Sequence, residues 1–143
     1  MKRQESGKFF EKDCSYTEEL RKIFAAVLIS IEAKLSESPK NTEKLINLAG
    51  NMKKIQAINE ENWRFDGVDA LNKFYDAVEG LKDILNIDEE LDDIDGLLDT
   101  IKSILEDIEN GDISSLIDLM DAIIPVMSIL MPLIEYGLNK VVP

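Results

Sequence analysis

Carboxylates are the most abundant side chains in this chain that could carry out acid–base chemistry. The sequence holds 29 Asp and Glu, no His, and a single Cys, Cys14. Two carboxyl groups can divide acid and base work only when their environments differ, which normally requires partial burial of one of them. The clustered acids Glu106, Asp107 and Glu109 fall on the polar side of a helical pattern. We therefore interpret them as a solvated helix face rather than as a catalytic pair.

Residue types exclude most other reactive sites. Without His, the chain cannot build His-based metal triads or the Ser-His-Asp and Cys-His nucleophile systems. The range Asp92–Gly96 resembles a calcium loop, but aligning Gly96 with the loop glycine puts Leu91 and Lys102 where oxygen ligands are required. No glycine-rich phosphate loop is present. The sequence predicts a protein that is not an enzyme, with no catalytic residue, no cofactor and no metal site.

The charge is distributed very unevenly along the chain. The formal net charge is -13, yet residues 1–58 hold eleven Lys and Arg against eight Asp and Glu. The remaining residues hold five basic side chains against 21 acidic ones, and within 88–121 Lys102 is the only base among thirteen acids. Phosphate contacts require Lys and Arg, so the acidic half is not expected to bind DNA or RNA directly. The same argument is against docking of that half on anionic lipid, so no membrane association is expected through it.

Hydrophobic periodicity predicts an all-α fold. Apolar residues recur at steps of three and four in several stretches, as on one face of an amphipathic helix. A capping box at Ser15–Glu18 favours a helix start there, and Gly111 favours a left-handed helix end with Asp112 capping the next helix. We expect a flexible tail over 1–14 and one antiparallel bundle of four to five helices over 15–143. The expected helices are 16–36, 39–58, 67–86, 88–109 and 113–140, with a loop over 59–67.

The last of these helices is unusually apolar. Residues 122–134 carry no charge and include Pro125 and Pro132. Thirteen residues fall short of the roughly 20 needed to span a bilayer, so a proline-kinked core helix is the preferred interpretation. The alternatives are an apolar surface that docks on a second copy of the chain, and association with a membrane.

An acidic stripe is the feature that most favours a function. Asp88, Asp92, Asp95, Asp99, Glu106 and Glu109 are the candidate partner-binding residues, because most of them repeat on one helix flank. Such a row repels itself, and a positively charged partner surface would compensate that cost. Trp63, Arg64 and Phe65 form a possible secondary contact, since Trp and Arg are typical interface anchors.

These features support two functional hypotheses. The first is a cytoplasmic, non-enzymatic protein that occupies a basic, nucleic-acid-binding groove of a polymerase- or nuclease-type partner as an inhibitor or regulator. The second is a coat-like or scaffold subunit that self-associates through its apolar C-terminal helix. Cytoplasmic localisation is expected because the first fifteen residues contain no apolar secretory segment.

Overall fold

The computed structural model describes residues 14–37, 41–82 and 91–140. These residues form α1 (Cys14–Glu37), α2 (Thr42–Gln56), the short π-helix η3 (Trp63–Gly67), α3 (Val68–Leu81), α4 (Leu91–Asn110) and α5 (Leu116–Lys140). The all-α bundle expected from the sequence is confirmed for the part of the chain described here.

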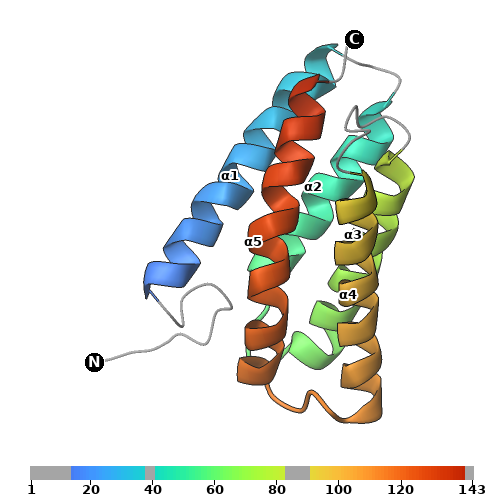
Figure 1. The fold of residues 1–143 in the computed structure, drawn as a ribbon. Helices are drawn as coiled ribbons and strands as arrows, with labels where there is room; N and C mark the ends of the chain where they lie inside the picture. The colour runs from blue at the N-terminus through green and yellow to red at the C-terminus, as the bar shows by residue number, and fades with distance from the viewer. Residues whose placement is uncertain (1–13, 38–40, 83–90, 141–143) are drawn as a thin grey trace.

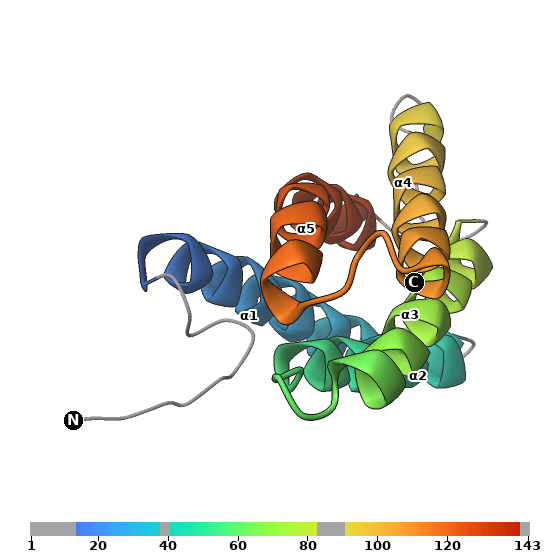
Figure 2. The same ribbon diagram turned by 90° about the horizontal axis from the view of Figure 1, so that it is seen from below.

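The five α-helices form a closed ring. α1 packs against α2 and α5, and α3 packs against α2 and α4, while α4 also packs against α5 (Figure 2). Helices that follow one another in sequence run in opposite directions, as expected (Figure 1). Because the ring has an odd number of helices, neighbouring helices cannot run in opposite directions at every contact. α1 and α5 are therefore parallel neighbours.

α5 supplies the largest share of the core. Its side chains Leu119, Ile123, Met127, Leu130 and Ile134 are all fully buried. α5 continues through Pro125 and Pro132, which lie on its exposed side. By length and composition alone α5 could cross a membrane, but half of its most apolar window is buried inside the bundle.

Several predicted boundaries differ from the structure. α1 already includes Cys14, so Ser15 does not cap it and the predicted tail is at least one residue too long. α2 ends at Gln56 rather than at residue 58, because Ala57 closes it with hydrogen bonds back to Lys53 and Lys54. The predicted end of α3 and start of α4, like the Ser38–Pro39 junction, lie outside the described residues.

The turn between α4 and α5 was predicted in part. Gly111 has φ +85°, which confirms the left-handed helix end that the sequence predicts. Asp112 does not cap α5, however. Ile113 is buried and holds the connector against the core, so α5 begins only at Leu116. Ser115 takes the capping role, because its Oγ accepts a hydrogen bond from the Asp118 backbone N–H at 3.2 Å.

Candidate functional site

The acidic stripe of α4 lies along the seam between α3 and α4. Lys82, at the end of α3, donates a hydrogen bond to the Asp95 carboxylate near the start of α4. At the opposite end of the seam, Val68 and Asn72 of α3 line a groove together with Glu106 and Glu109 of α4. From Asp95 to Glu109 the stripe extends about 21 Å along the helix axis. The seam therefore fixes which way the carboxylates face.

The structure distinguishes between the six predicted stripe residues. Asp99, Glu106 and Glu109 are exposed, and within the described residues none of them forms an ion pair or hydrogen bond. Asp95 is half-buried and paired with Lys82. Asp88 and the side chain of Asp92 lie outside what the structure describes. Within the described residues, the stripe carboxylates available to a partner thus lie between Asp99 and Glu109 of α4.

Lys82 neutralises one end of the stripe. Its ammonium group contacts Asp95 and also lies 3.5 Å from a Glu79 carboxylate oxygen. The hydrogen bond to Asp95 raises the pKa of Lys82, and the negative charge of Glu79 adds to this, while desolvation acts in the opposite direction. Lys82 is therefore a structural cation that ties α3 to α4, and Asp95 is less suited to partner binding than the sequence indicates.

α3 adds carboxylates that the sequence reasoning missed. Asp76 and Glu79 follow Asn72 at steps of four and three, so they occupy the flank of α3 that faces α4. Asp76 is exposed, and no ion pair or hydrogen bond engages it in the described part of the chain. Packed helices have axes 8–10 Å apart, so carboxylates line both sides of the seam. This second row could be assigned only once the pairing of α3 with α4 was known.

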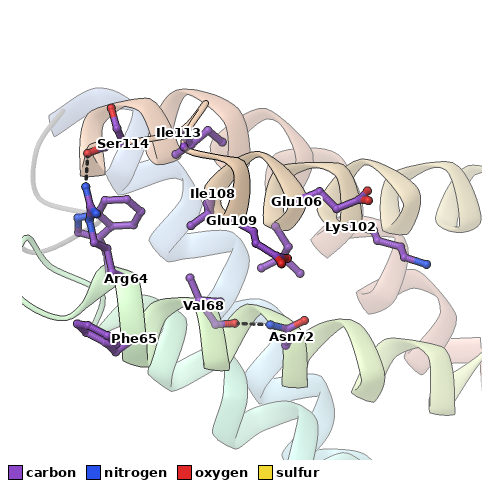
Figure 3. A pocket seen from close by; sticks show the side chains of 13 residues that line it. Arg64, Phe65, Val68, Asn72, Lys102, Glu106, Ile108, Glu109, Ile113 and Ser114 are labelled. Carbon is purple, nitrogen blue, oxygen red and sulfur yellow. Dashed lines mark hydrogen bonds between the residues drawn. The ribbon is translucent and has the colours of Figure 1, made fainter.

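A groove opens where the acidic stripe meets η3. It has a volume of about 680 Å³ and lies between η3, the start of α3, the end of α4 and the α4–α5 connector (Figure 3). The half-buried side chains Val68, Leu105 and Ile108 give it an apolar floor. Figure 3 shows Glu109 pointing from α4 toward α3 across this space. The groove brings both predicted contact regions, the acidic stripe and the Trp63–Phe65 segment, into one site.

Two asparagines position η3. Asn59 Oδ1 accepts hydrogen bonds from the backbone N–H groups of Glu61 and Asn62, at 2.9 and 3.0 Å. Asn62 Oδ1 in turn accepts one from the Asn59 N–H at 2.8 Å. Gly67 closes the π-turn by donating to the Asn62 carbonyl at 3.1 Å, and a Cβ at Gly67 would lie only 3.3 Å from Ile58. The segment predicted as a loop is thus an ordered turn.

The three aromatic and basic residues of η3 have different surroundings. Trp63 is 5% exposed and packs into the core, so it is not itself a surface anchor. Arg64 lies 4.9 Å from the centre of the Trp63 ring and donates from Nη2 to the Ser114 carbonyl at 2.9 Å. Arg64 therefore connects η3 to the α4–α5 connector at one end of the groove (Figure 3). Phe65 is 78% exposed, which makes it the accessible aromatic at this site.

A second surface feature lies on α5. Pro125, Ile129, Pro132 and Tyr136 recur at steps of four and three on the outer side of the helix, and all four are exposed. Lys140 lies 4.4 Å from the Tyr136 ring centre at one end of this α5 stripe. One side of the apolar C-terminal helix is consequently buried in the core, and its opposite side is an exposed apolar surface.

The carboxylates of the described residues do not gather as metal ligands do. Within the described residues, no three acidic or thiol side chains come close enough to hold a metal ion. The chain matches no known protein-family model, no curated protein and no solved structure. Its function must therefore be inferred from the site alone.

Proposed function

We propose that this protein is a non-enzymatic, cytoplasmic binding protein whose acidic α3–α4 seam occupies a basic, nucleic-acid-binding groove of a polymerase- or nuclease-type partner. The observation that carries the proposal is a row of exposed carboxylates along this seam that have no partner in the described residues: Asp99, Glu106 and Glu109 on α4, with Asp76 on α3. The protein would inhibit or regulate its partner by blocking access of nucleic acid.

The energetics of the seam support this assignment. Like charges spaced three or four residues apart on a helix repel one another by a few tenths of a kcal/mol per pair. That cost is offset when a complementary positive surface approaches. Grooves that bind nucleic acid supply such a surface, because phosphate contacts are made by Lys and Arg. Binding of this kind is expected to be fast and strongly weakened by salt.

The experiment is capture of the partner followed by competition. The tagged protein is incubated with source-cell lysate and washed. The captured complex is then treated with a DNA or RNA duplex, or in parallel with increasing salt concentrations. The proposal expects a captured nucleic-acid enzyme that the duplex displaces. A captured protein that binds no nucleic acid, or that the duplex fails to displace, would contradict it.

Two matched variants sharpen this experiment. The triple variant D99N/E106Q/E109Q neutralises the free carboxylates of α4, and E32Q/E43Q/D121N removes the same charge from exposed positions on α1, α2 and α5. The first variant is expected to lose capture while the second retains it. Equal loss in both would indicate diffuse attraction by net charge rather than a defined surface.

Self-association is a second candidate function, favoured by the exposed α5 stripe. A stable interface buries roughly 800 Å² per partner from some 20–30 residues. The four side chains of the stripe fall well short of that number, so we rank this function below the first. Sedimentation across a concentration range tests it, with I129K as the disrupting variant. A monomer at all concentrations rules it out.

A further inference from the structure

We infer that the groove between η3 and the end of α4 receives a short protein segment that carries a bulky apolar side chain flanked by Lys or Arg. This inference deepens the proposed function and rests on it for the identity of the partner, because the segment would belong to the same partner. It adds an apolar contact in the groove to the two stripe carboxylates, Glu106 and Glu109, that line it.

The apolar component follows from the groove floor. Val68, Leu105 and Ile108 are only half-buried, so each presents carbon surface to the groove. Phe65 adds an aromatic ring that is 78% exposed at the same site. Burying apolar surface contributes about 25 cal/mol for each Å² removed from water. A bulky apolar side chain is therefore the group that gains most from entering the groove.

The basic component follows from the charges that remain unpaired. Arg64 already donates a hydrogen bond to the Ser114 carbonyl and lies over the Trp63 ring, so it is poorly placed to bind an acidic group of a ligand. Glu106 and Glu109 line the groove, and no ion pair engages them in the described residues. Lys102 also lines it, but Figure 3 shows this side chain directed along α4, away from Glu109 and the groove centre. Lys or Arg of the incoming segment would complement the two carboxylates.

The groove also limits the size of the segment. Its α4 wall extends from Lys102 to Glu109, which corresponds to about 10 Å along the helix axis. This length accommodates about two turns of a helix or about three extended residues. The occupant is thus a short motif and not a folded domain, which is why synthetic peptides are suitable probes.

The test uses a short amphipathic peptide of leucine and lysine, titrated into the intact protein. Trp63 is the only Trp in the chain and lines the groove, so its fluorescence reports binding there. Two control peptides replace every lysine with glutamate or every leucine with serine. The inference expects saturable one-to-one binding of the Leu/Lys peptide, and at least about tenfold weaker binding of both controls. Failure of the Leu/Lys peptide to bind, or equal binding of the serine peptide, would overturn it.

Two charge-matched variants locate the contact. E106Q/E109Q removes both groove carboxylates, and D93N/D121N removes two exposed carboxylates outside the groove, one on α4 and one on α5. The first is expected to weaken peptide binding about tenfold, and the second no more than about twofold. Equal weakening by both pairs would overturn the groove assignment. Circular dichroism of each variant verifies that the helices are intact.

This test is independent of the proposed function. The peptide titration contains no nucleic-acid enzyme, so the groove can be validated even if the captured partner is not displaced by a duplex. Conversely, the duplex could displace the captured partner while the variant F65A, which lacks the exposed aromatic ring, binds that partner as tightly as the wild type does. That result would support the proposed function and overturn the groove contact.

Discussion

The Arg64 guanidinium donates a hydrogen bond to the Ser114 carbonyl at 2.9 Å, although the two residues are fifty positions apart. This contact joins η3 to the connector between α4 and α5, and Arg64 also lies over the Trp63 ring at 4.9 Å. It thereby fixes one end of the groove. The aromatic segment and the acidic stripe are separate features of the sequence, and they share a site at the groove that this contact borders.

Replacing Arg64 with Ala should lower the free energy of unfolding by about 1 kcal/mol, since one hydrogen bond and one cation–π contact are lost. Urea denaturation followed by Trp63 fluorescence measures this change. R64K is the control, because it keeps the charge but not the planar guanidinium, and it should recover only part of the loss. An R64A variant as stable as the wild type would show that the contact does not hold η3 in solution.

The Lys82–Asp95 pair should make stability depend on pH in the alkaline range. The pKa of Lys82 is raised above its usual value of 10.5 in the folded protein. Its contribution is therefore fully present below that pH and is lost as the pH rises through the higher folded value. The melting temperature of the wild type should exceed that of K82Q at neutral pH, and the two melting temperatures should converge above about pH 10.5. A difference that stays constant at alkaline pH would mean that the ammonium charge is not what stabilises the seam.

Two glycines should respond to alanine with opposite signs. Gly111 has φ +85°, so G111A should destabilise the protein by about 1 kcal/mol, and G111N by less because Asn tolerates this conformation. Gly50 lies inside α2, and an added Cβ there meets no atom within 4 Å. G50A should stabilise the protein by about 0.5–1 kcal/mol. Chemical denaturation of both variants measures the two effects, and destabilisation by G50A would contradict the helix assignment.

The sequence was sufficient to predict the helices and several turns. Repeats of three and four residues predict α3 and α4, and Gly111 followed by Asp112 predicts the left-handed helix end that its φ of +85° confirms. These features depend on neighbours within a few residues. The π-turn at Trp63–Gly67 was missed, although the Asn59 and Asn62 pair is a local signal for an ordered turn.

The candidate site required tertiary information. Which flank of α4 faces α3 depends on how the two helices pack, so the pairing of Asp95 with Lys82 could not be read from spacing. The groove likewise needs Val68 beside Leu105, more than thirty residues away. Charge pattern alone therefore ranks Asp95 with Asp99 as a partner contact, whereas of these two residues only Asp99 is exposed and unpaired in the described part of the chain.

The measurement that tests the central claim most directly is the salt dependence of binding to the captured partner. Dissociation constants are measured over a range of salt concentrations for the wild type, D99N/E106Q/E109Q and E32Q/E43Q/D121N. The proposed function predicts that the α4 variant binds at least about tenfold more weakly at low salt and has a shallower salt dependence, while the control variant stays close to the wild type. Indistinguishable affinities and slopes for the two triple variants would contradict the claim that the α3–α4 seam is the binding surface.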